Sequence, residues 1–373
     1  MKDEGGRMKS IAERVIERAI EIQQIPAPTF GESRRAEFVR DTFVAEGLKD
    51  VSMDEAGNVF ACLAGSGGRK PLIVSAHLDT VFPADTDLRI TRGSESIRGP
   101  GLGDNSLGIA ALSGLAWLMR TRGIEPAGDL WLVANVGEEG LGNLRGMKAV
   151  VDRFGANALV YLVVEGLALG HIYHRAVGVR RYRIRARTSG GHPWSDHGKP
   201  SAVHELSRLV VAFLSIDLPR APRTTLNVGR ISGGTAVNVI APEAELELDL
   251  RSEGRQALAA LASEAEGLIQ AANKPEVRFE AGVIGERPTG EIDPDHPLVE
   301  LAQECLREQG LEAALTSGST DANLPLSKGY PALVLGITTG GGAHTMHEFI
   351  NLAPVARGME QLGSFVERAW DKQ

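Results

Sequence analysis

Side chains of metal-ligand type directly follow the apolar runs of this sequence. His77 follows PLIVSA, Glu139 comes shortly after LWLVANV, and Glu165 follows ALVYLVV. The run PALVLGI is followed by a glycine-rich turn and then by His344 and His347. Imidazole nitrogens and carboxylate oxygens are common protein ligands of zinc and similar divalent ions. These residues therefore predict metal chemistry.

The four apolar runs do not alternate with polar residues and are rich in β-branched side chains, which is typical of central strands covered on both faces. Helical patterns lie between them, for example over residues 105–120. This order predicts an α/β domain with a mostly parallel sheet and helices on both faces. The carboxyl ends of parallel strands share one edge of a sheet, where ligands bind.

We therefore expect a set of metal ligands to converge at that edge. The set is His77, Asp104, Glu139, Glu165 and His347. Five ligands with three carboxylates are too many for one tetrahedral zinc ion, but they suit two divalent ions about 3.5 Å apart that share a carboxylate. Asp104, in the turn GPGLGDNSLG between strands, is the expected bridge.

Two further acidic residues lie beside these ligands. Asp79, two residues after His77, is placed to accept the second imidazole N–H and so to orient the ring. Glu138 and Glu139 stand together between glycines that let the backbone turn. One can bind a cation while the other accepts a proton from an attacking water.

The middle of the chain has a different pattern. RRYRIRAR, at 180–187, alternates as a strand with one solvated face does, and we favour that interpretation over an anion-binding patch. The elements that follow complete a β-α-β-β-α-β order, the ferredoxin-like arrangement. We expect residues 175–284 to form an inserted α+β lid or dimerisation domain. Residues 1–174 and 285–373 would form the catalytic domain.

Composition narrows the classes of function. The net charge of −8 argues against nucleic acid as a partner, since phosphate binding needs a basic surface. Cys62 and Cys305 have no disulfide or metal spacing and predict buried thiols in a reducing cytosol. We see no signal peptide and no apolar run of membrane length, so we expect a cytoplasmic protein without a membrane partner.

Four motifs together resemble the dinuclear-zinc exopeptidase and deacylase family. They are SAHLDTVFP, GPGLGDNSLG, GEEGLG and AHTMHEF. The family includes aminoacylases, acetylornithine deacetylase, glutamate carboxypeptidase and peptidase T-like enzymes, and the resemblance covers nearly the whole chain. It implies that water activated by two zinc ions hydrolyses an amide bond in a small peptide or N-acyl amino acid.

The resemblance also implies roles for the predicted ligands. One zinc ion would be bound by His77, Asp104 and Glu165, and the other by Asp104, Glu139 and His347. Cobalt or manganese could replace zinc at such ligands.

Beside the metals, the resemblance makes Glu138 the general base and Asp79 the residue that orients His77. In the lid, TSGGHPWSDHGKPSA resembles the segment whose histidine stabilises the oxyanion in the partner subunit's site, which implies a homodimer and points to His192. His197 is the competing histidine, and the glycine pair before His192 decides between them.

GGTAVNVIAPEAELELDLR resembles the substrate-binding strand pair, with Asn238 and Arg251 at the matching positions. An arginine can hold a substrate carboxylate through two parallel hydrogen bonds.

The substrate clues in the motifs disagree. A glutamate at position 165 accompanies deacylases and carboxypeptidases in the family, whereas GEEGLGNLRG and GSTDAN resemble the peptidase T branch. A cytosolic aminotripeptidase is therefore the alternative. A non-catalytic binding protein on the same fold would need a broken motif, and here every catalytic position is filled. A serine hydrolase is disfavoured because no G-x-S-x-G motif occurs.

Overall fold

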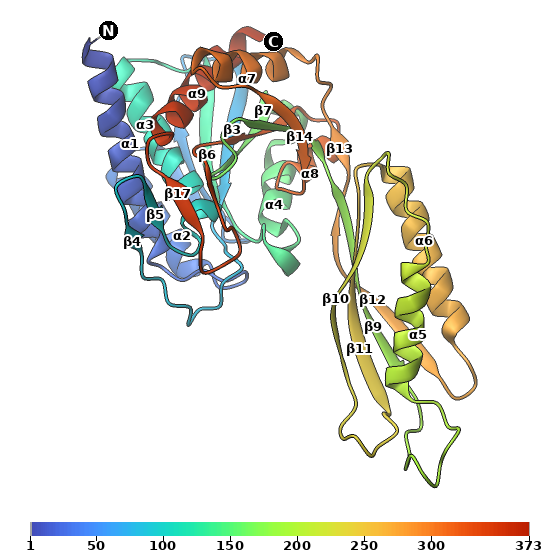
Figure 1. Cartoon of the computed structure of the whole chain (residues 1–373). Helices are drawn as coiled ribbons and strands as arrows, with labels where there is room; N and C mark the ends of the chain where they lie inside the picture. The colour runs from blue at the N-terminus through green and yellow to red at the C-terminus, as the bar shows by residue number, and fades with distance from the viewer. Residues whose placement is uncertain (1, 373) are drawn as a thin grey trace. The chain divides into compact units, whose positions relative to one another are not determined.

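The computed structural model describes residues 2–372 and divides into two compact units (Figure 1). Unit 1 contains the described residues up to Ala176 and from Gly290 onward, and unit 2 contains Val177–Thr289. The expected division placed the insertion at residues 175–284. Residues 1 and 373 of that prediction lie outside the described residues.

Unit 1 is built on a nine-stranded mixed sheet with helices on both faces, which confirms the predicted α/β class (Figure 1). The strands run in the order β1 (Lys49–Met53), β2 (Val59–Leu63), β6 (Gly128–Asn135), β3 (Arg69–His77), β7 (Val160–Glu165), β15 (Ala332–Gly336), β8 (His171–Ala176) and β13 (Gly290–Glu291), and β14 (Ala314–Gly318) pairs with β8. The central strands β6, β3, β7 and β15 are parallel to one another, and antiparallel strands lie towards the edges.

The apolar composition of the central strands explains their position. Every residue of β15 is buried, and so are the first five of β7, because helices cover both faces of the sheet. The helices of unit 1 are α1 (Lys2–Gln23), α2 (Ser33–Ala45), α3 (Leu107–Arg122), α4 (Arg145–Phe154), α7 (Pro297–Glu308), α8 (Asn323–Ser327) and α9 (Val355–Arg368). A small second sheet contains β4 (Thr91–Arg92), β5 (Ser96–Arg98), β16 (Gly340–Gly341) and β17 (Phe349–Asn351).

Unit 2 has the predicted β-α-β-β-α-β order. Its elements are β9 (Gly178–Arg187), α5 (Ala202–Leu214), β10 (Thr224–Gly233), β11 (Glu243–Ser252), α6 (Arg255–Ala272) and β12 (Arg278–Arg287). The four strands form one antiparallel sheet in the order β10-β11-β9-β12.

The alternating arginines of β9 lie on the open face of this sheet, opposite acidic residues of β11. Arg181 pairs with Asp249 at 2.8 Å, and Arg183 pairs with Glu247 at 2.9 Å. The arginines are thus neutralised by a ladder of ion pairs, as the solvated-strand interpretation required.

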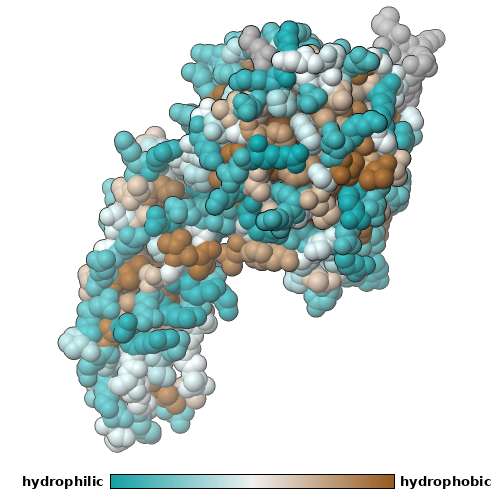
Figure 2. Space-filling model, turned by 180° about the vertical axis from the view of Figure 1, so that it is seen from behind, coloured by the Kyte–Doolittle hydropathy of each residue, from teal (hydrophilic) through white to brown (hydrophobic). Residues whose placement is uncertain are grey.

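Two properties of the surface complete the description. Among residues 2–372, no helix combines the length and the apolar character needed to cross a membrane. The face drawn in Figure 2 is mostly hydrophilic, with separate hydrophobic areas on each unit.

Candidate active site

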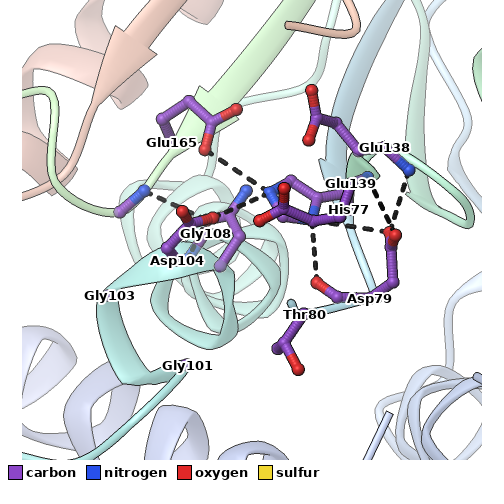
Figure 3. A network of polar contacts seen from close by, with 12 residues as sticks. His77, Asp79, Thr80, Gly101, Gly103, Asp104, Gly108, Glu138, Glu139 and Glu165 are labelled. Carbon is purple, nitrogen blue, oxygen red and sulfur yellow. Dashed lines mark hydrogen bonds and ion pairs between the residues drawn. The ribbon is translucent and has the colours of Figure 1, made fainter. Parts of the chain in front are cut away.

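The carboxyl end of β3 carries the centre of the predicted site. His77, the last residue of β3, is buried, and its Nε2 lies 3.1 Å from Asp104 Oδ1 and 3.7 Å from Glu165 Oε2. Glu165 ends the neighbouring parallel strand β7, and Asp104 lies in the single helical turn Leu102–Ser106 before α3. Figure 3 shows these side chains turned towards one another, as expected from parallel strands that end at one edge.

Asp104 joins this group to a second one. Its Oδ2 lies 3.1 Å from His344 Nε2, and the same nitrogen lies 3.1 Å from Glu139 Oε1. The two carboxylate oxygens of Asp104 therefore face two different imidazoles. A carboxylate placed in this way could bridge two cations.

The electrostatics of the cluster favour positive charge. Burial alone would lower the pKa of His77, but hydrogen bonds with Asp104, Asp79 and Glu165 outweigh it, so the pKa lies well above its ordinary value. Hydrogen bonds with Asp104 and Glu139 raise the pKa of His344 to about 10. Protons on these imidazoles supply positive charge that a cation would otherwise provide.

The carboxylates respond to the same environment. Burial would raise the pKa of Asp104, yet hydrogen bonds with His344 and His77 lower it strongly. Burial, together with the charges of Asp104 and Glu139, raises the pKa of Glu165. Like charges in a buried site disfavour ionisation, so a second positive charge near Glu165 would offset the repulsion from Asp104 and Glu139 and favour the ionised carboxylate.

The donor set fits divalent metal ions. Ligand atoms of His77, Asp104 and Glu139 lie within 4.8 Å of one another, and His344 and Glu165 extend the group on either side. Two imidazoles and three carboxylates are the ligands expected for a pair of zinc-like ions.

The histidine on the second side differs from the one predicted. We expected His347, but within residues 2–372 it forms no ion pair with these carboxylates, and its backbone N–H bonds to Thr345 Oγ1 at 3.1 Å. His344 instead reaches Asp104 and Glu139, from a backbone with φ of 64°. The left-handed conformation turns the chain at this position and brings His344, rather than His347, to these carboxylates.

Asp79 has a wider set of contacts than predicted. His77 Nδ1 lies 3.0 Å from the backbone carbonyl of Asp79 and 3.6 Å from its carboxylate. The carboxylate accepts the backbone N–H of Glu138 at Oδ1 and that of Glu139 at Oδ2, each at 2.9 Å (Figure 3). Thr29 Oγ1 donates a further hydrogen bond to Oδ2 at 2.9 Å. One buried carboxylate thus fixes the backbone of the loop that carries both glutamates.

The two adjacent glutamates present their carboxylates in different directions (Figure 3). Glu139 faces the cluster of ligands, whereas the Glu138 side chain turns away from Asp79. Both are buried. Their shared backbone clamp and divergent side chains suit one metal ligand and one proton acceptor.

Glu348 holds the turn that carries Asp104, a role that the sequence analysis did not predict. Its buried carboxylate accepts backbone N–H groups from Gly101 at 3.0 Å, Gly103 at 2.6 Å and Asp104 at 2.9 Å. This cup fixes the turn that presents Asp104. Glu348 follows His347 directly in the sequence, but nothing local shows that it contacts a turn about 245 residues earlier.

In unit 2, two of the predicted residues lie in adjoining loops. Gly191 forms a β-bridge with Ile240, which ties the His192 loop to the Asn238 loop. His192 Nδ1 accepts the backbone N–H of Trp194 at 3.2 Å and of Ser195 at 3.4 Å. A neutral His192 therefore carries its proton on Nε2, which leaves that nitrogen as a donor.

Arg251 lies at the other end of the same sheet. It pairs with Val179 near the start of β9, whereas His192 comes after β9 has ended at Arg187. Strands rise about 3.3 Å per residue, so roughly 25 Å separates Arg251 from the His192 loop. Arg251 Nε also bonds to Asp249 Oδ1 at 2.7 Å, and the structure does not bring Arg251 together with Asn238 or His192.

The sequence is similar to those of known peptidases. Residues 73–368 match the model of peptidase family M20/M25/M40. Over 223 residues the chain is 29% identical to a probable carboxypeptidase of Aspergillus terreus, with 52% of this chain and 47% of that protein aligned. The chain spans about half the length of this relative and of a peptidase M20 domain-containing protein of Schizosaccharomyces pombe that it also matches.

The chain is also similar to solved structures over almost its whole length. A tripeptidase from Staphylococcus aureus has a TM-score of 0.82 at 22% identity, covering 96% of this chain and 99% of that one. YxeP of Bacillus subtilis, described as a dinuclear metal-binding peptidase, has a TM-score of 0.69 at 16% identity, with 98% and 100% covered. At these identities the structural likeness shows the fold alone.

Proposed function

The chain belongs to peptidase family M20/M25/M40, and from that membership and the converging ligands we propose that it hydrolyses an amide bond with two divalent metal ions. The substrate we propose is a small peptide or an N-acyl amino acid, and the metal is zinc, with cobalt or manganese as substitutes. The observation that carries the proposal is the placement of the two Asp104 oxygens, each 3.1 Å from a different imidazole.

We propose that His77, Asp104 and Glu165 hold one ion and that Asp104, Glu139 and His344 hold the other. His344 takes the place that the sequence analysis gave to His347 because it contacts both Asp104 and Glu139. When bound, such ions would polarise the amide carbonyl and make water a stronger nucleophile.

Glu138 is the proposed general base. It accepts a proton from the attacking water and passes it to the leaving nitrogen, so that one carboxyl group serves both steps. Asp79 keeps Glu138 in place through the backbone N–H, and it keeps Glu139 in place in the same way. The proposed metal ligand Glu139 and the proposed base Glu138 are therefore both held by the Asp79 carboxylate.

His192 is the proposed donor to the oxyanion, and Asn238 and Arg251 are the proposed substrate-binding residues. The proton expected on His192 Nε2 supports the first role. Because roughly 25 Å separates Arg251 from the His192 loop of the same unit, a small substrate cannot contact both from the same lid. We therefore propose a homodimer in which one chain supplies Arg251 and its partner supplies His192 to the same site.

The location and the alternative substrate class are also proposals. Cys62 and Cys305 are free and buried, which suits a reducing compartment such as the cytoplasm. A free-carboxylate product is favoured by Glu165 and by the likeness to a probable carboxypeptidase. An aminotripeptidase is the second candidate, since the fold is similar to that of a tripeptidase.

A matched substrate panel tests the proposal. The zinc-loaded protein is given free dipeptides and tripeptides, their N-acetyl forms and their C-terminal amides. Cleavage that tolerates N-acetylation but refuses the amides supports the favoured class. Cleavage that requires a free amine makes the protein an aminopeptidase, and failure to cleave any amide overturns the proposal.

A further inference from the structure

Exposed apolar side chains in unit 1 concentrate around the candidate site. Its exposed large apolar residues, within the described part of the chain, are Phe30, Val44, Val81, Leu141, Met346 and Met53. Single exposed apolar residues are normal on a protein surface. Four of these six, however, lie within two positions of Thr29, Asp79, Glu139 or His344, so their distribution is not that of scattered surface residues.

Their positions in the chain place these residues, here called the apolar rim (Phe30, Val81, Leu141 and Met346), next to residues of the candidate site. Phe30 is 65% exposed and follows Thr29, whose Oγ1 lies 2.9 Å from Asp79 Oδ2. Leu141 lies in the turn Gly140–Gly142, which the N–H of Gly142 closes on the Glu139 carbonyl at 2.8 Å. Met346 is 48% exposed and lies two residues after His344. Residues two positions apart have Cα atoms no more than about 7 Å apart.

The cation that lies over the Phe30 ring is paired with a carboxylate. Arg145 binds both oxygens of Glu32, at 2.8 and 2.9 Å, and its guanidinium lies 5.5 Å from the centre of the Phe30 ring. The charge beside Phe30 is therefore compensated by Glu32.

Three of the seven exposed large apolar residues in unit 2 also lie beside residues proposed for the reaction. Trp194, 89% exposed, lies two residues after His192, and the exposed Val237 and Val239 flank Asn238. Both units thus present apolar surface next to the residues assigned to the reaction.

We propose that the apolar rim selects substrates with an apolar side chain next to the scissile amide. This inference rests on the proposed amide hydrolysis and adds the class of side chain. An apolar side chain gains by leaving water at such a surface, whereas a polar side chain of equal size would lose hydrogen bonds with water and find no partner. The proposed substrate is therefore an N-acyl amino acid or short peptide with leucine, methionine or phenylalanine next to the scissile amide.

The test compares side chains of equal size on the zinc-loaded protein. The substrates are N-acetyl amino acids and glycyl dipeptides. Each series contains two matched pairs, leucine with asparagine and methionine with glutamine, and the corresponding glycine compound is the reference. We expect kcat/KM to be about tenfold or more higher for leucine than for asparagine, and likewise for methionine over glutamine. A ratio near one or below overturns the inference, while cleavage of the glycine compounds keeps the proposed hydrolysis intact.

Two matched variants locate the preference. Met346→Gln and Phe30→Ser should lower the leucine-to-asparagine ratio several-fold, whereas Met53→Gln should leave it unchanged, because Met53, 36% exposed, lies in β1. An equal loss on both substrates would mean that the rim contacts protein rather than substrate, and it would overturn the assignment. If the zinc-loaded wild type cleaves no compound, including the glycine references, then the proposed function itself fails.

Discussion

The Oδ2 atom of Asp79 accepts the backbone N–H of Glu139 at 2.9 Å. The other oxygen accepts the N–H of Glu138 at the same distance, so the carboxylate spans two consecutive peptide groups. Burial opposes the charge, but His77 and these hydrogen bonds outweigh it and lower the pKa of Asp79. The ionised carboxylate is therefore the form that the surrounding donors select.

Replacing Asp79 by asparagine should weaken both metal binding and turnover. The amide can accept only through its oxygen, so one of the two N–H groups, at Glu138 or Glu139, loses its acceptor. Loss of a residue that supports metal ligands costs about 10–100-fold in affinity or activity. Zinc titration and kcat on the best substrate of the panel measure the effect. Unchanged kcat and zinc affinity would contradict the clamp.

Replacing Glu138 and Glu139 separately should affect metal content differently. Glu138→Ala should lower kcat by about 10²–10⁴-fold, the usual contribution of a general base, with both zinc ions still bound. Glu139→Ala should release zinc, since Glu139 faces His344 and the ligand cluster. Zinc measured per chain separates the two roles. Lost zinc in Glu138→Ala would make that residue a ligand instead.

The two histidines of the AHTMHEF segment provide an internal control. His344→Ala should lose one of the two zinc ions, because His344 contacts Asp104 and Glu139. His347→Ala should retain both, since within residues 2–372 no ion pair joins its side chain to the ligands and its hydrogen bond to Thr345 Oγ1 comes from the backbone N–H. Metal analysis of both purified variants decides between them. Zinc loss in His347→Ala alone would restore the original assignment.

A buried carboxyl group behind the site predicts a dependence of stability on pH. Asp321 accepts a hydrogen bond from Asn135 at 2.7 Å on Oδ2, while its buried Oδ1 lacks a partner. Burial raises the pKa of Asp321 from 3.8 to about 7. The folded protein thus binds this proton more tightly than the unfolded chain does. The contribution of this proton to the free energy of unfolding is fully present below pH 3.8 and is lost as the pH rises to about 7.

Asp321→Asn should remove this contribution. The melting temperature of the wild type should fall relative to that of the variant when metal-free samples are taken from pH 5 to pH 8. The comparison cancels groups that titrate in both proteins. Parallel changes in the two melting temperatures would mean that Asp321 does not titrate in this window.

The strands and the convergence of ligands could be predicted because both follow from local composition. Apolar β-branched runs specify buried parallel strands, and parallel strands bring their carboxyl ends to one edge. His77 and Glu165 could therefore be placed beside one another without coordinates. Asp104 could be named as the bridge because it lies on the turn between strands.

The remaining features depend on contacts between distant parts of the chain. No local pattern shows that Thr29 reaches Asp79 or that Glu348 cups the turn before Asp104. The choice between His344 and His347 depended on one left-handed residue in a glycine-rich turn. The glycine run before His344 was the available signal, since such runs allow sharp turns of the backbone.

The position of Arg251 was also beyond sequence patterns. Asn238 and Arg251 belong to one motif, yet a strand of ten residues separates their ends of the sheet. Spacing along a sequence understates distance when the intervening residues are extended.

The zinc content of the wild type and of Asp104→Asn tests the central claim most directly. The account predicts two zinc ions per chain in the wild type. It also predicts weaker binding of both ions in Asp104→Asn, because each Asp104 oxygen faces a different imidazole. A wild type that is fully active with a single zinc ion would contradict the account. So would an Asp104→Asn variant that binds two ions with unchanged affinity.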